Sequence, residues 1–163
     1  MKRLSTLLVD DDGYARDLLG SILRELGCTV EHAVSSGEEA IRKCGKTRVD
    51  VMFLDIEMPG MNGFDTLQKM LTERPGQYVV MISAHSTLDN VKKAMELGAR
   101  GFIVKPYTGA KVRDVLEKYR RDCIQPHTEP TLAAADRTHN DERSRSDDLD
   151  LESEPERAVD NPA

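Results

Sequence analysis

Hydrophobic and polar positions follow two alternating patterns along residues 4–121. Short runs of consecutive apolar residues, such as Val-Met-Phe-Leu at 51–54, are typical of strands that are buried on both faces of a sheet. Between these runs, apolar residues recur three and four positions apart, as Leu18, Leu19, Ile22 and Leu23 do, which indicates amphipathic helices. The two patterns alternate five times. This alternation predicts an α/β fold, with a parallel sheet and helices on both of its faces.

Capping residues and glycines mark the expected ends of these elements. Asp12 is expected to cap the first helix, and Gly27 follows its last periodic residue. Ser36 precedes the second helix with Glu39 three residues later, as in a capping box. The strands are expected at 4–9, 29–33, 49–54, 78–82 and 101–104, and the helices at 14–26, 36–44, 64–73, 87–97 and 109–121.

Charge and composition divide the chain near residue 122. The whole chain of 163 residues has a formal net charge of −6. Residues 123–163 hold eleven acidic and four basic residues, so they contribute −7 and leave +1 for residues 1–122. The second segment has too few large apolar residues to offset the entropy lost on ordering. We therefore expect one folded domain at 1–122, followed by a disordered acidic tail at 123–163.

Several classes of site and partner find no support in the sequence. Cys28, Cys44 and Cys123 form no CxxC pair and no zinc-binding spacing, and an odd number of cysteines suits a reducing cytosol. No apolar run approaches the roughly 18 residues that a membrane span needs. Neither segment carries the basic patch typical of nucleic-acid binding, and no glycine-rich nucleotide-binding motif occurs. We expect a cytoplasmic protein without nucleic-acid or membrane partners.

Polar side chains that are suited to catalysis or ligand binding follow the ends of the expected strands. Asp10 and Asp11 follow the first strand, and Asp55, Ser83 and Lys105 follow the third, fourth and fifth. Parallel strands end at a common edge, where open α/β sheets bind ligands, so these side chains are expected to lie together. A cluster of carboxylates needs a cation, and oxygen ligands suit Mg²⁺. With a lysine and a hydroxyl to bind an oxyanion, the set fits transfer of a phosphoryl group to an aspartate.

These residues also occur in the order and spacing of a known family. The motifs are Val-Asp-Asp-Asp at 9–12, Leu-Asp-Ile-Glu-Met-Pro-Gly-Met-Asn-Gly at 54–63, Ser83-Ala84, and Val-Lys-Pro at 104–106. Together they resemble the receiver domain of bacterial two-component response regulators, over about residues 4–121. The resemblance implies a flavodoxin-like, doubly wound sheet of five parallel strands in the order 2-1-3-4-5.

The resemblance implies a role for each residue at the strand ends. Asp55 matches the phosphoacceptor, and Lys105 and Ser83 match the residues that bind the phosphoryl group. The implied cofactor is Mg²⁺, and its implied ligands are Asp10, Asp11, Asp55 and the backbone carbonyl of Glu57.

The resemblance also identifies switch residues. Phe102 matches the aromatic switch position, which is often Tyr in chemotaxis-type members, and Ser83 is its implied counterpart. Pro106 matches a proline that usually follows a cis peptide bond. Two structural alternatives stay open: Phe102 is a core residue of an apolar strand, and His85 is either a partner of Glu57 across the site or a solvated loop histidine.

The implied function is that of a stand-alone, chemotaxis-regulator-like receiver in a phosphorelay, because residues 123–163 lack the apolar pattern of an output domain. A histidine kinase or phosphotransfer protein would phosphorylate Asp55. A downstream protein would bind the face formed by the fourth helix, the fifth strand and the fifth helix. Such a receiver catalyses only its own phosphorylation and dephosphorylation and is otherwise not an enzyme.

Two other functions are considered. The segment Asp-Ile-Glu at 55–57 loosely resembles the Asp-x-Asp of haloacid-dehalogenase phosphatases, but in that family the nucleophile follows the first strand. A scaffold that does not respond to phosphorylation is the other alternative, and the intact acidic cluster speaks against it.

Overall fold

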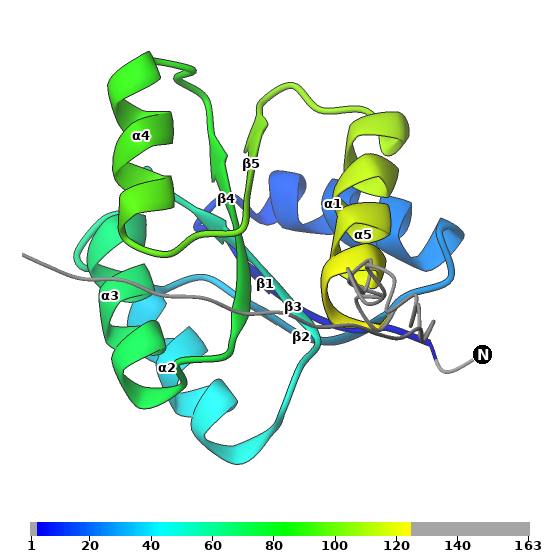
Figure 1. Ribbon diagram of the computed structural model, residues 1–163, viewed down its shortest axis with the longest axis horizontal. Coiled ribbons are helices and arrows are strands. Elements are labelled where there is room, and N and C mark those ends of the chain that lie inside the picture. Colours follow the sequence, from blue (N-terminus) through cyan, green and yellow to red (C-terminus); the bar gives the residue numbers. More distant parts are fainter. Residues whose placement is uncertain (1–2, 125–163) are drawn as a thin grey trace, which may run out of the picture. The chain divides into compact units, whose positions relative to one another are not determined.

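The computed structural model describes residues 3–124, and these residues form an alternating series of strands and helices (Figure 1). The strands are β1 (Ser5–Val9), β2 (Thr29–Val34), β3 (Val51–Asp55), β4 (Tyr78–Ser83) and β5 (Gly101–Val104). The helices are α1 (Gly13–Glu25), α2 (Gly37–Lys46), α3 (Gly63–Glu73), α4 (Leu88–Glu96) and α5 (Gly109–Cys123). Neighbouring strands are parallel, and the sheet order is β2-β1-β3-β4-β5. The predicted fold and strand order are confirmed.

The expected bounds of the elements differ from the observed bounds by two residues at most. Helix α5 continues to Cys123, two residues beyond its expected end, and the division into a folded domain at 1–122 and a tail at 123–163 stays a prediction. The acidic tail beyond residue 124 lies outside the described residues. Among the helices of residues 3–124, none combines the length and apolar composition that a membrane crossing requires.

The sheet separates two hydrophobic cores. Helices α1 and α5 cover one face, and α2, α3 and α4 cover the other (Figure 1). Phe53 packs in the first core with Leu23 and Leu116, whereas its neighbour Leu54 packs in the second with Leu67. All residues of the central strands β3 and β4 are buried. Burial on both faces explains why these strands are continuous apolar runs rather than alternating ones.

Local side-chain hydrogen bonds start the helices close to the ends of the strands. The Asp12 carboxylate accepts hydrogen bonds from the backbone N–H groups of Tyr14 and Ala15, at 2.9 and 3.4 Å. Ser36 Oγ accepts one from the N–H of Glu39, at 3.3 Å. Both caps were predicted. Each satisfies a helix-terminal donor that has no partner within its own helix.

Gly63 allows helix α3 to begin directly beside the end of β3. Its N–H donates to the carbonyl oxygen of Ile56 at 3.0 Å. A Cβ atom at this position would lie 2.2 Å from the carbonyl oxygen of Asp55 and 2.6 Å from the Cα of Ile56. Since these are backbone atoms, no side-chain rotation relieves the overlap. A side chain at this glycine would therefore displace the backbone that carries Asp55.

We predict that Gly63→Ala lowers the free energy of unfolding by about 1–3 kcal/mol through this overlap. Gly45→Ala is the matched control, because a Cβ on this glycine of α2 would meet nothing within 4 Å. That variant should be neutral or more stable by up to about 1 kcal/mol, the helix propensity gained. Urea denaturation of both variants measures the difference. Equal stability of the two variants would contradict the prediction.

Candidate functional site

The polar residues predicted at the strand ends lie along the carboxyl edge of the sheet. Asp55 is the last residue of β3 and Ser83 is the last residue of β4. Asp10 follows β1, and Lys105 follows β5. The register pairs Asp55 with Ile82, so Ser83 lies one residue beyond the level of Asp55 on the neighbouring strand. The parallel sheet thus brings together residues that are up to 95 positions apart in the chain.

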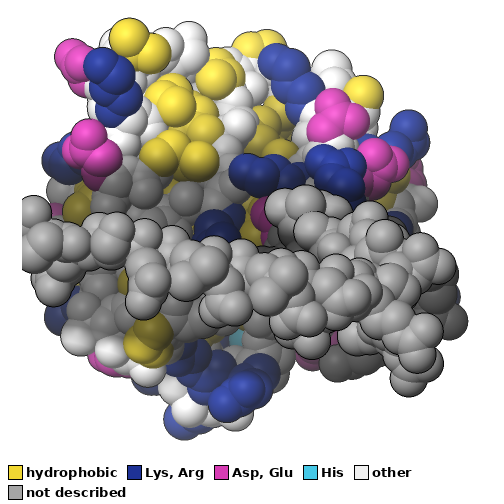
Figure 2. Space-filling model, in the orientation of Figure 1, with side chains coloured by type: hydrophobic (Ala, Val, Ile, Leu, Met, Phe, Trp, Pro, Cys, Tyr) yellow, Lys and Arg dark blue, Asp and Glu magenta, His cyan; other side chains and the backbone are white. Residues whose placement is uncertain are grey.

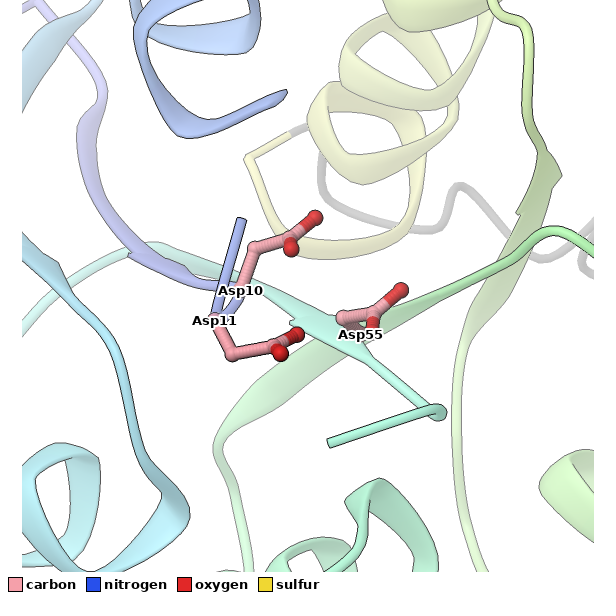
Figure 3. Close-up of side chains that lie close together, drawn as sticks. All are labelled: Asp10, Asp11 and Asp55. Carbon is pink, nitrogen blue, oxygen red and sulfur yellow. The ribbon is translucent and has the colours of Figure 1, made fainter. Parts of the chain in front are cut away.

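Three carboxylates converge at this edge. Asp10 and Asp11 reach it from the end of β1, and Asp55 reaches it from the end of β3 (Figure 3). One oxygen from each lies within 4.8 Å of the others. Asp10 and Asp55 are buried, whereas Asp11 is exposed. The side-chain donors of this cluster are all oxygen atoms, which is the chemistry that hard divalent cations bind.

Lys105 lies between the two buried carboxylates. Its Nζ is 2.7 Å from Asp10 Oδ2 and 2.9 Å from Asp55 Oδ1. The first contact is also a hydrogen bond, whereas Asp55 Oδ1 is buried without any partner of good hydrogen-bond geometry in residues 3–124. Burial alone would lower the pKa of Lys105, but the interactions with Asp10 and Asp55 outweigh it and raise this pKa.

The surroundings of Asp55 disfavour the ionised form of its carboxyl group. Burial raises its pKa to about 6, and the charges of Asp10 and Glu57 act in the same direction. Lys105 opposes these effects without cancelling them. The carboxylate that ends β3 is therefore short of positive charge, and a cation or an additional hydrogen-bond donor would stabilise its ionised form.

Asp10 is held in place by three donors, two of which the sequence analysis missed. The backbone N–H of Asp12 donates to Asp10 Oδ1 at 2.9 Å, while Lys105 binds Oδ2. The Arg16 guanidinium donates to the Asp10 backbone carbonyl at 2.6 Å. Arg16 lies one helical turn into α1, so its helical position was predictable, but its contact with the preceding loop was not.

The Glu57 side chain forms an arrangement that we did not predict. The Ser83 hydroxyl donates to Glu57 Oε1 at 2.6 Å, and the backbone N–H of Ala84 donates to Oε2 at 3.3 Å. His85 Nδ1 lies 3.4 Å from Oε1, so the open alternative of a Glu57–His85 pair matches the observed contact. Burial would raise the pKa of Glu57, but the hydrogen bonds from Ser83, Ala84 and His85 outweigh burial and lower it.

The remaining residues singled out from the sequence lie on β5 and just beyond it. Phe102 is partly buried and packs against the core under α2, α3 and α4. The Lys105–Pro106 peptide bond is cis. Tyr107, which the sequence analysis did not identify, donates its hydroxyl to the carbonyl of Ala15 at 3.2 Å and so joins the loop after β5 to α1.

Comparisons with known proteins agree with this geometry. A family model of the response regulator receiver domain matches residues 6–117. The chemotaxis protein CheY of Listeria monocytogenes is 34% identical over 115 residues, which are 71% of this chain and 97% of the relative. The CheY of Thermotoga maritima is 33% identical over 112 residues, covering 69% of this chain and 93% of the relative.

Solved structures show the same likeness. A chain from the CheX–CheY–BeF3–Mg²⁺ complex of Borrelia burgdorferi has a TM-score of 0.68 and 33% identity, over 69% of this chain and 86% of that one. A CheY-like receiver domain protein from Methanospirillum hungatei has a TM-score of 0.65 and 27% identity, over 74% of this chain and 99% of that one.

The comparisons also bear on the two alternative functions. They do not favour a haloacid-dehalogenase phosphatase, and the sheet places Asp55 after the third strand rather than the first. They favour signalling over a passive scaffold, since the chain aligns with the two CheY chemotaxis proteins over nearly their full length. The chain belongs to the response regulator receiver family, the phosphorelay signalling domain of two-component systems.

Proposed function

We propose that Asp55 accepts a phosphoryl group from a histidine kinase or a phosphotransfer protein, and that the domain signals through protein–protein contacts. The observation that carries the proposal is the convergence of the buried Asp55 carboxylate with Asp10, Asp11 and Lys105 at one edge of the sheet. The cluster carries more negative than positive charge, and its exposed member Asp11 connects it to the surface. Such a cluster is suited to bind a phosphoryl group together with a cation.

The proposed reaction is a displacement at phosphorus. An Asp55 carboxylate oxygen forms the new bond to phosphorus while the bond from phosphorus to the donor's histidine nitrogen breaks, and the departing imidazole takes up a proton. Lys105 then neutralises charge on the phosphoryl oxygens, for which its ammonium is already positioned 2.9 Å from Asp55. The domain thus promotes its own phosphorylation, with the phosphohistidine of the donor as the other reactant.

The same residues fit Mg²⁺. Asp10, Asp11 and Asp55 would hold it together with the backbone carbonyl of Glu57, a proposal supported by the oxygen-only donors and by the buried Asp55 Oδ1 without a hydrogen bond. When bound, Mg²⁺ neutralises charge on the transferring phosphoryl group.

The proposed output surface is the face formed by α4, β5 and α5. Leu88 and Met95 of α4 are 69% and 44% exposed. Figure 2 shows hydrophobic side chains gathered over α4 and β5, with lysine and arginine side chains around them. Exposed apolar groups bordered by charges are typical of protein-binding surfaces. We propose that Ser83 and Phe102 couple phosphorylation of Asp55 to this face. The cytoplasmic location of the protein stays a prediction.

We predict that acetyl phosphate with Mg²⁺ adds one phosphoryl group to the chain, and that Asp55→Asn abolishes the addition because the nucleophile is lost. Hydroxylamine should release the group, since it is an acyl phosphate. Intact-mass spectrometry measures both steps. Asp12→Asn is the matched control, because the same chemical change there preserves a helix cap and leaves Asp55 untouched. A phosphoryl group on serine or histidine would contradict the mechanism.

A second prediction follows from the pKa of Asp55, which is about 6 in the folded protein and about 3.9 in an unfolded chain. Folding therefore takes up a proton between these values. The protonated Asp55 carboxyl group therefore contributes to the stability of the folded domain. This contribution is fully present below about pH 4 and is lost as the pH rises through 6. In metal-free buffer, Asp55→Asn should raise the free energy of unfolding by about 1–3 kcal/mol at pH 7.5 and leave it nearly unchanged at pH 3.5.

Urea denaturation across this pH range measures the effect, with Asp12→Asn as the control for the loss of one surface carboxylate. A stabilisation by Asp55→Asn of equal size at both pH values would show that desolvation of the ionised carboxylate is not its cause.

A further inference from the structure

The Glu57 carboxylate accepts hydrogen bonds from two donors next to the proposed site of phosphorylation. The Ser83 hydroxyl lies 2.6 Å from Oε1, and the Ala84 backbone N–H lies 3.3 Å from Oε2. Each oxygen of the same carboxylate therefore has a donor from the end of β4, and His85 Nδ1 lies 3.4 Å from Oε1 as well. Two donors that converge on an anion in this way form a small oxyanion site, and its present occupant is a side chain of the protein itself.

These donors come from the strand next to Asp55. Ser83 is one residue beyond Ile82, the register partner of Asp55. A phosphoryl group on Asp55 would extend from the end of β3 at the level where β4 presents Ser83. Its oxygens carry about two negative charges and accept hydrogen bonds strongly. The phosphoryl group and the Glu57 carboxylate would therefore require the same donors, and their like charges would repel each other.

The two partners of this hydrogen bond differ in their access to water. The Ser83 side chain is fully buried, with 0% exposure, and its hydroxyl has two acceptors within reach, Glu57 Oε1 at 2.6 Å and the His85 carbonyl oxygen at 2.9 Å. The Glu57 side chain is 37% exposed and can turn into water without losing hydration. Glu57 is thus the partner that can leave, and the Ser83 hydroxyl is then free to donate to a phosphoryl oxygen or to the His85 carbonyl oxygen.

We propose that the Glu57 side chain is an internal competitor of the phosphoryl group: it binds Ser83 and Ala84 in the unphosphorylated domain and is displaced when Asp55 is phosphorylated. This inference rests on the proposed function of Asp55. It gives the Glu57 carboxylate a regulatory role that is separate from any role of its backbone carbonyl. The hydrogen bond to Glu57 holds Ser83 in the unphosphorylated arrangement. An acceptor that binds Ser83 more weakly than a phosphoryl group would therefore not displace Glu57 and would not trigger the switch.

The test is a titration with beryllofluoride, a mimic of the phosphoryl group, at saturating Mg²⁺, followed by NMR. Glu57→Gln keeps the size of the side chain and an acceptor oxygen but removes the charge. It should bind beryllofluoride roughly five- to thirtyfold more tightly than the wild type, because a charge-assisted hydrogen bond is replaced by a weaker neutral one. Asp12→Asn removes one exposed carboxylate near the site without contacting Ser83, and should stay within about twofold of the wild type.

A double-mutant cycle identifies the route of the effect. In a Ser83→Ala background the hydroxyl is absent and only the Ala84 N–H and the charge of Glu57 remain, so Glu57→Gln should increase the affinity for beryllofluoride by a clearly smaller factor than in the wild type. In the unliganded protein, Glu57→Ala should move the Ala84 amide proton resonance upfield, since its charged acceptor is gone. This last readout does not depend on phosphorylation of Asp55.

The outcomes separate the inference from the proposed function. Normal binding by the wild type with no gain in Glu57→Gln, or an equal gain in the Ser83→Ala background, would overturn the competition and leave the function of Asp55 intact. A wild type that binds no beryllofluoride would overturn the proposed function, and the competition with it. The Ala84 resonance would then still report whether the Glu57 contact exists.

Discussion

Three carboxylates converge at the carboxyl edge of the sheet, and Lys105 supplies one ammonium group among them. This imbalance of charge governs the rest of the site. The ammonium contacts both buried carboxylates, so removing it would leave Asp10 and Asp55 as uncompensated buried charges, a change that typically costs about 3–5 kcal/mol. With Lys105 in place, the pKa of Asp55 is still raised to about 6. The domain therefore folds around a site that favours the arrival of a cation.

The parallel sheet is what makes such a site achievable. Its strands bury both faces and end at a common edge, so residues from β1, β3 and β5 meet although they are far apart in the chain. The Asp12 cap starts α1 directly after the acidic loop, and Gly63 lets α3 approach the backbone of Asp55. The helices thus hold the loops of the site close to a rigid edge, which keeps the carboxylates near one another despite their repulsion.

The sequence was sufficient for the fold and for the buried part of the site, because both follow from periodicity. Apolar runs that stop in Asp10, Asp55 or Lys105 locate those residues at the edge as soon as the strands are parallel. The contacts of Glu57 with Ser83 and Ala84, and that of Arg16 with Asp10, were missed for a physical reason. Each depends on the path of a loop and on the rotamer of a long side chain, and neither leaves a periodic signal. The partial burial of Phe102 likewise depends on how α4 packs on the sheet.

The affinity for Mg²⁺, measured by isothermal titration calorimetry, tests most directly whether the excess of negative charge makes this edge a site for a cation and a phosphoryl group. We predict a Kd in the micromolar to millimolar range, or roughly −8 to −4 kcal/mol. Asp11→Ala should weaken binding by at least about tenfold, because it removes the exposed carboxylate of the cluster. Asp12→Asn should leave the affinity unchanged within about twofold, since Asp12 caps α1 and is outside the cluster. An unchanged Mg²⁺ affinity in Asp11→Ala would contradict the account.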